Sequence, residues 1–121
     1  MKKYKFTGKT KKHNCITLNQ IVAVRNFGNV KAGDIGGWIE SEKSLSHDGN
    51  VWVSRNSLIS DNGRVFGNAQ VFGAAKIFGE SKVSGNSSVF GNARVFGASR
   101  VSGNSRVRGD AKVSGHQVIN K

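Results

Sequence analysis

Basic side chains recur at a fixed interval in the second half of the chain. Two groups of three cations have members eighteen residues apart, namely Lys76, Arg94 and Lys112, and Arg64, Lys82 and Arg100. The chain holds 19 Lys and Arg against 7 Asp and Glu, which gives a formal net charge of +12. A surface adapted only for solubility mixes charges of both signs. Regular cations with few acidic neighbours therefore favour contact with an anionic partner.

Aromatic side chains accompany these cations, and two pairs of them, Phe72 with Phe90 and Phe78 with Phe96, keep the same interval. The rings are Trp52, Phe72 and Phe90, then Phe78 and Phe96, and finally Phe66. Rings flanked by cations are the combination that binds single strands and nucleotides. The same rings could instead pack copies of the chain together or stabilise neighbouring coils. We expect a homo-oligomer, packed through the face that carries Trp52, Phe72 and Phe90 or through the C-terminal coil.

Two places compete as the anion-binding site. The first is the ladder of Lys76, Arg94 and Lys112, beside Phe78 and Phe96. The second is a basic segment, expected to be a flexible loop, that holds Lys9, Lys11 and Lys12. Further candidate cations are Arg64, Lys82, Arg100, Arg106 and Arg108. Nucleic acid, a nucleotide and an acidic protein surface stay open as partners, and so does a basic surface that serves only solubility.

A six-residue repeat explains the interval. From Gly49 to residue 120 the chain reads in twelve hexads, such as GNARVF at residues 91–96. The first position is usually Gly, the third is usually Ala or Ser, and the fifth is always Val or Ile. Gly followed by Asn is a turn signal, and the residues after it alternate like a strand. A Gly every six residues would cost a helix about 1 kcal/mol each time, so a helix is disfavoured.

Such short strands are stable only when successive coils stack. Three hexads per coil, as in known hexapeptide β-helices, place residues eighteen apart on one face, about 4.8 Å from each other. We predict an all-β fold, a parallel β-helix of hexapeptide type with about four triangular coils and a small β cap at its N-terminus. Left-handed winding is expected. The predicted inward ladder is Val53, Ile59, Val65, Val71, Ile77, Val83, Val89, Val95, Val101, Val107, Val113 and Ile119, with small residues such as Ala69, Ala75, Ser81, Ser87, Ala93, Ser99, Ser105 and Ala111 beside it.

Residues 1–48 do not keep the period. The segments around Tyr4 and Ile16 alternate like two strands of a hairpin, and residues 21–27 are predicted as a third strand. Several glycines then mark turns before Trp38. The predicted division is therefore an N-terminal β cap with a connecting segment, residues 1–48, followed by the hexapeptide β-helix, residues 49–121.

Other classes of protein are disfavoured by what the chain contains. The single Cys15 does not support a disulfide framework within one chain. His13 nearby adds a second potential metal ligand, and two ligands do not make a site, so we expect no metal and no cofactor. No run approaches the roughly 18 apolar residues of a membrane span, and no signal peptide is recognised. We expect a cytoplasmic protein without membrane contact.

Hexapeptide acyltransferases provide one enzymatic alternative. They use a catalytic histidine near a groove between subunits, and a long loop often helps to build the site. Here only His116 lies in the repeats, and no long loop interrupts the twelve hexads. We therefore predict no catalytic residues and no enzymatic activity, with acyl transfer as a remote alternative.

The chain resembles small phage and prophage proteins. Those proteins carry a K-F-T-G start, a D-x-G-G-W-I segment and G-N-A-x-V-(Y/F) hexads, which here correspond to residues 5–8, 34–39 and hexads such as 91–96. The resemblance covers essentially the whole chain and implies a phage origin. Because phages carry many small inhibitors of host defence, it also implies a counter-defence role.

The resulting expectation is a non-enzymatic binding module in the cytoplasm of a host bacterium. It would hold or sequester an anionic host target, which could be a nucleic acid, a nucleotide signal or a nucleic-acid-handling defence protein such as a CRISPR effector. The alternative is a self-associating structural or virion accessory protein without a ligand.

Overall fold

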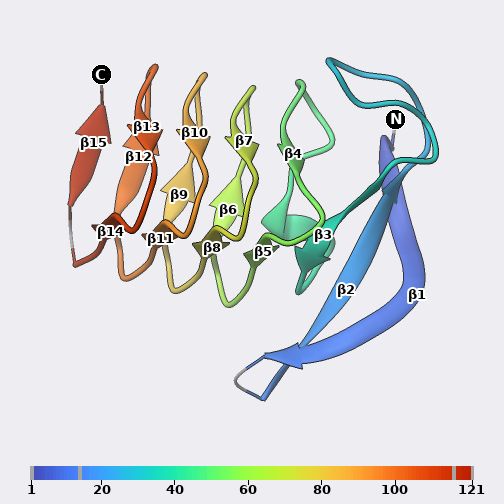
Figure 1. Cartoon of the computed structure of the whole chain (residues 1–121), viewed down its shortest axis with the longest axis horizontal. Coiled ribbons are helices and arrows are strands. Elements are labelled where there is room, and N and C mark those ends of the chain that lie inside the picture. The colour runs from blue at the N-terminus through green and yellow to red at the C-terminus, as the bar shows by residue number, and fades with distance from the viewer. Residues whose placement is uncertain (1, 14, 116, 121) are drawn as a thin grey trace.

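The protein is a β-solenoid of about four turns with almost no helix (Figure 1). The computed structural model describes residues 2–13, 15–115 and 117–120. In this part of the chain the helical content is one 3₁₀ turn, η1 (Glu42–Ser44). The predicted all-β, parallel hexapeptide β-helix is therefore confirmed.

Every third short strand of the solenoid belongs to the same parallel sheet, which gives the coil three faces. The first face contains β4 (Trp52–Val53), β7 (Gln70–Val71), β10 (Ser88–Val89) and β13 (Arg106–Val107). The second face contains β5 (Leu58–Ile59), β8 (Lys76–Ile77), β11 (Arg94–Val95) and β14 (Lys112–Val113). The third face contains β6 (Arg64–Val65), β9 (Lys82–Val83), β12 (Arg100–Ser102) and β15 (Val118–Asn120).

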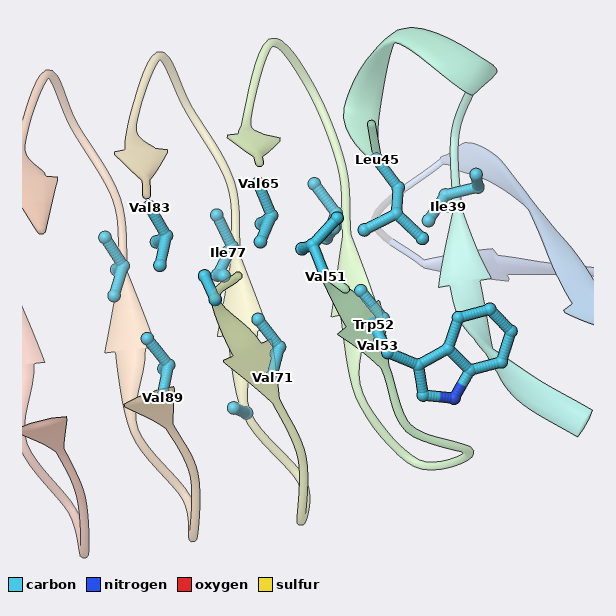
Figure 2. Close-up of a cluster of buried hydrophobic side chains, with 14 of the residues drawn as sticks. Ile39, Leu45, Val51, Trp52, Val53, Val65, Val71, Ile77, Val83 and Val89 are labelled. Atoms are coloured by element: carbon cyan, nitrogen blue, oxygen red, sulfur yellow. The ribbon is translucent and has the colours of Figure 1, made fainter. Parts of the chain in front are cut away.

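The core is the predicted inward ladder. Its valines and isoleucines are buried from Val53 to Val113, while Ile119 in the last hexad is only partly buried. Figure 2 shows part of this row, including Val71, Ile77, Val83 and Val89. Among the small residues, Ala111 differs from the prediction because it is exposed. The inward serines are satisfied by nearby carbonyls; Ser81 Oγ, for example, donates to the carbonyl oxygen of Phe78 at 2.8 Å. A hydroxyl can therefore sit in this narrow interior without an unpaired polar group.

Glycine at the first hexad position suits the left-handed backbone at most corners of the coil. Gly91 has φ of 72°, and a Cβ atom there would lie 2.9 Å from the backbone nitrogen of Gly109 in the next coil. Only glycine adopts this left-handed conformation freely. Asp61 takes the glycine position of its hexad with φ of 57°, and its Oδ2 accepts the N–H of Gly79 at 3.2 Å.

The N-terminal strands extend the second face into a continuous seven-stranded sheet. β1 (Tyr4–His13) and β2 (Ile16–Ala23) form the predicted antiparallel hairpin, and β2 pairs with β3 (Ile35–Ile39). β3 then pairs in parallel with β5, which joins the hairpin to the solenoid. The prediction of a third strand over residues 21–27 is wrong, because residues 21–23 complete β2 and Phe27 forms only an isolated bridge with Val30.

The basic segment near the N-terminus is also different from its prediction. Lys9, Lys11 and Lys12 lie within β1 and not in a flexible loop. The backbone of this segment is paired with β2, since Lys11 faces Leu18 and Lys12 faces Thr17 in the register. Its cations are therefore held by a sheet.

Stacking of coils begins before the first complete hexad. Ile39 pairs with Ile59 and Leu45 bridges to Val65, so both apolar side chains continue the inward rows (Figure 2). These partners are twenty residues apart, whereas Val53 and Val71 are eighteen apart. The first coil thus carries two extra residues between Leu45 and Val53.

Lys3 fills the irregular corner made by these extra residues. Its side chain is fully buried, and Nζ donates to the carbonyl oxygens of Val51 at 2.6 Å and Gly49 at 3.3 Å. The ammonium also lies 4.6 Å from the centre of the Phe27 ring. These contacts compensate part of the cost of burying a charge.

Candidate functional site

The second face brings together the cations of the predicted ladder. Arg94 is directly opposite Lys76 on one side and Lys112 on the other, in the register of β8, β11 and β14. Arg94 and Lys112 are exposed, while Lys76 is partly covered. The predicted stacking of these residues is therefore present, with one cation in each of three successive coils.

Two phenyl rings lie beside this ladder. Phe78 and Phe96 stack with their ring centres 5.0 Å apart and their planes inclined by 3°. Each ring follows two residues after a ladder cation, on the same outer side of its coil. The pair is partly buried and offers a short apolar strip next to the charges.

The β1–β2 hairpin reaches the same face. Its far end lies on the side of the solenoid that carries β5 and β8 (Figure 1). There His13 and Ile16 from the hairpin, with Ser60, Asp61 and Phe78 from the solenoid, line a cleft of about 260 Å³. The hairpin segment and the ladder, which the sequence presented as competing sites, therefore meet on the second face through Lys11 and His13.

The pKa values of His13 and Lys11 are affected by the cations of the ladder. The pKa of His13 is lowered from 6.5 by partial burial and by the positive charges of Lys76, Lys11 and Arg94. The pKa of Lys11 is lowered by burial and by Lys76. Lys11 also lies 4.6 Å from the centre of the Trp38 ring, which holds its ammonium near the solenoid. At neutral pH the arrangement places an uncharged imidazole among three cations.

His47 is fixed in a different role. Its Nδ1 accepts the backbone N–H of Lys3 at 3.1 Å, so its Nε2 carries the proton and donates to Glu42 Oε1 at 2.9 Å. The ring is stacked on Tyr4, whose hydroxyl donates to the Leu45 carbonyl oxygen at 2.7 Å. Both nitrogens are occupied, and His47 is therefore a structural residue of the first coil. His116, the histidine of the repeats, lies outside the described residues.

The third face carries the other predicted ladder. Arg64, Lys82 and Arg100 are in register across β6, β9 and β12. They line a cleft of about 480 Å³ together with Asn62, Glu80 and Ala98. Phe66, which is 41% exposed, lies with Lys82 and Arg100 along a neighbouring cleft. This face receives no strand from the hairpin.

The first face differs from its prediction at Trp52. Trp52 was expected on an exposed aromatic surface, but only 7% of it is accessible. Phe27 lies edge-to-face against it, with ring centres 5.4 Å apart. Phe72 and Phe90 do stack along this face at 4.8 Å, and Arg106 and Arg108 are exposed beyond them.

Sequence reasoning considered His13 only as a potential metal ligand near Cys15, so its position beside the ladder was missed. The signal that could have found it is the hairpin register. Once β2 is paired with β3, and β3 with β5, the far end of the hairpin must lie along the second face.

Comparison with known proteins adds one partial relative. No family model matches the chain. A stretch of 44 residues is 46% identical to uncharacterized acetyltransferase YdcK of Escherichia coli (strain K12). The match covers 36% of this chain and 13% of that protein, so the chain spans only a small part of the relative's length. Fold and match together fit a hexapeptide-repeat β-helix.

This match corrects the prediction that the chain is not an enzyme. The similar protein carries the name of an acetyltransferase, which points towards enzymatic activity.

Among the described residues, no helix is both long and apolar enough to cross a membrane.

Proposed function

We propose that the chain acts in acyl transfer and binds the phosphate groups of an acyl-coenzyme A on its second face. The observation that carries this proposal is the position of His13 beside Lys11, Lys76 and Arg94, at the edge of a cleft. The hexapeptide-repeat fold and the acetyltransferase name of the partial relative support the same reaction class.

The proposed chemistry requires a neutral base and a place for negative charge. A hydroxyl or amine acceptor attacks the thioester carbonyl carbon, and His13 takes the proton that the acceptor loses. The carbon–sulfur bond then breaks, and the thiolate leaves and recovers that proton from the imidazolium. The products are the acylated acceptor and the free thiol. Because partial burial and then the nearby cations lower the pKa of His13, the imidazole is in its basic form at neutral pH.

The ladder supplies the binding energy for the anionic end of the thioester. Lys76, Arg94 and Lys112 are fixed by parallel pairing, so little order has to be imposed on the backbone when a ligand binds. The Phe78–Phe96 pair provides a stacking surface for a base ring next to the phosphate contacts.

Two sets of substitutions test this function. Changing Lys76, Arg94 and Lys112 together to Ser should weaken binding of acetyl-coenzyme A, measured by calorimetry, by at least about tenfold. The matched control changes Arg64, Lys82 and Arg100 on the third face, which removes the same charge and should change binding much less. Equal losses from both variants would show that only net charge matters.

His13→Ala tests the reaction itself. Release of free thiol is followed in the presence of a panel of amine and hydroxyl acceptors. Removal of a general base should lower the rate by roughly 10²-fold or more, while the affinity for acetyl-coenzyme A changes little. An unchanged rate in His13→Ala, or no thiol release by the unmodified protein with any acceptor, would contradict the proposal.

A second candidate function is the binding of a polyanion by the same face. It is favoured by the length of the ladder, because Lys112 lies two coils away from Lys76. The partner would be a nucleic acid or an acidic surface of a nucleic-acid-handling host protein, as the resemblance to phage proteins implies. Affinity for a single-stranded oligonucleotide should then fall steeply with salt. If the oligonucleotide binds and acetyl-coenzyme A does not compete with it, this second function replaces the first.

A further inference from the structure

The first face contains a cleft of a different chemical character. It has a volume of about 650 Å³ and lies between the loop of residues 28–30 and strands β4 and β7. Its main lining residues are Asn29, Asn50, Asn68, Gln70, Trp52 and Phe72. None of the described residues that line it is charged, although the chain has a net charge of +12. An anionic ligand is therefore not favoured here.

The amides of this cleft are held in place by the solenoid. Asn68 Oδ1 accepts the backbone N–H of Asn50 at 3.1 Å, and Asn68 Nδ2 donates to Asn86 Oδ1 at 3.3 Å. Gln70 Nε2 donates to the carbonyl oxygen of Asn50 at 2.8 Å. Within the described part of the chain, the side-chain amides of Asn29 and Asn50 make no hydrogen bond. The cleft thus combines fixed amides with amides that can take a ligand's donors and acceptors.

An aromatic ring completes the cleft. One side of Phe72 is covered by Phe90, with ring centres 4.8 Å apart and planes inclined by 1°. The corresponding position one coil earlier is Ser54, so the row of rings ends at Phe72. Phe72 is 40% exposed and lines the cleft. Trp52, held by Phe27, forms a rigid part of the wall.

We propose that this cleft binds a neutral pyranose sugar. Hydroxyl groups are both donors and acceptors and match the amides of Asn29, Asn50 and Gln70. The C–H face of a pyranose ring can pack on Phe72. An entirely apolar ligand would leave the amides without partners, which is unfavourable. The volume is within the range of small-molecule sites. The cleft is on a different face from His13, so the proposal does not depend on acyl transfer.

Nuclear magnetic resonance of the full chain tests the site. The probes are N-acetylglucosamine, methyl α-glucopyranoside and methyl β-galactopyranoside, with sorbitol and glucuronate for comparison. At least one of the three pyranosides should shift the side-chain amide signals of Asn50 and Gln70 in a saturable way, with a Kd of about 1 mM. Sorbitol, which has no ring face, and glucuronate, which is anionic, should bind at least tenfold more weakly.

Two matched variants separate stacking from general effects. Phe72→Ser should weaken pyranose binding at least tenfold. Phe66→Ser changes a ring at the same hexad position with nearly the same exposure, 41% against 40%, and should leave binding unchanged. Both rings are exposed, so neither change should unfold the protein.

Several results would overturn the proposal. Absence of saturable shifts with all three pyranosides would do so, as would equal binding of sorbitol or glucuronate. Equal losses in the two Phe variants would exclude stacking on Phe72. If Phe72→Ser instead dissociates an oligomer and no sugar binds, this ring belongs to an interface between copies of the chain.

Discussion

The buried ammonium of Lys3 gives the stability of this protein an unusual dependence on pH. Burial, and then the charge of Arg25, lower the pKa of Lys3 from 10.5 to about 8, although Asp48 opposes the shift. Between these two pH values the unfolded chain carries a proton on Lys3 that the folded chain has lost. Stability rises with pH wherever the unfolded state binds more protons, so it should rise from pH 8 to 10.5.

The magnitude follows from the size of this shift. One pKa unit corresponds to about 1.4 kcal/mol, so a change from 10.5 to about 8 amounts to about 3 kcal/mol. Tyr4 acts in the opposite direction, because burial, and then the charge of Glu42, raise the pKa of its hydroxyl well above 10.0. Above pH 10 the unfolded chain loses the Tyr4 proton first, and folding becomes less favourable. We therefore expect maximal stability near pH 10.

Lys3→Met should remove the increase of stability with pH, because methionine carries no titratable group. The methionine side chain still fills the space of the aliphatic part of Lys3. The substitution also leaves the carbonyl oxygens of Gly49 and Val51 without their donor, at a cost of about 1–3 kcal/mol. At pH 7 this loss offsets much of the gain from not burying a charge. The informative quantity is therefore the change of stability with pH and not its value at pH 7.

The assay is urea denaturation of the unmodified protein, Lys3→Met and the control Lys5→Met at several pH values from 7 to 10. Lys5 is exposed on β1, two residues after Lys3, so its substitution should leave the pH dependence almost unchanged. The control is needed because removing any lysine also lowers the net positive charge, which relieves repulsion in a basic protein. Parallel curves for the unmodified protein and Lys3→Met would refute the argument.

Val89→Asp should unfold or aggregate the protein, because it places an unpaired charge at a fully buried position of a narrow core; circular dichroism with an unchanged melting temperature would contradict this. Gly91→Ala should lower the free energy of unfolding by more than about 2 kcal/mol, and Gly109→Ala by about 1 kcal/mol. Both residues have positive φ, but only a Cβ atom at Gly91 would meet the backbone of the next coil. Equal losses in urea denaturation would show that this contact relaxes. Sedimentation velocity at micromolar concentration should show a homo-oligomer, and a species of single-chain mass would rule it out. A proton resonance titration should place the pKa of His13 below 6.5, and a higher value would remove the support for a neutral base.

The solenoid could be predicted because its information is local and repeated. Each hexad contains its own turn and its own inward Val or Ile, so all twelve hexads independently indicate which residues face the core. A single deviating hexad does not disturb this pattern, as Asp61 shows by adopting the positive φ of a glycine. The outward ladders then follow from three hexads per coil, and the structure has Lys76, Arg94 and Lys112 in that register.

The candidate site could not be predicted in the same way because it depends on contacts between distant segments. The buried Trp52 has Phe27 packed edge-to-face against it, and this contact leaves no periodic signal in the sequence. The two extra residues before Val53 are recognisable only after Leu45 has been paired with Val65. The local alternation of residues 4–13 predicts a strand, but it does not say which face of the solenoid the strand will approach.

If the proposed acyl transfer is correct, the placement of the hairpin links binding of the ligand to the basicity of His13. Burial lowers the pKa of His13, and the charges of Lys76, Lys11 and Arg94 lower it further. A phosphate group bound to these cations reduces that repulsion, so the imidazole becomes a stronger base when the anionic end of a ligand is in place. His13 then holds an acceptor's proton more firmly in the occupied site than in the free protein. In the polyanion-binding alternative the same linkage favours protonation of His13, which adds a fourth cation to the contact. Both functions use the ladder cations Lys76, Arg94 and Lys112. They differ in the role of His13, which takes a proton from the acyl acceptor in acyl transfer and only adds positive charge in polyanion binding.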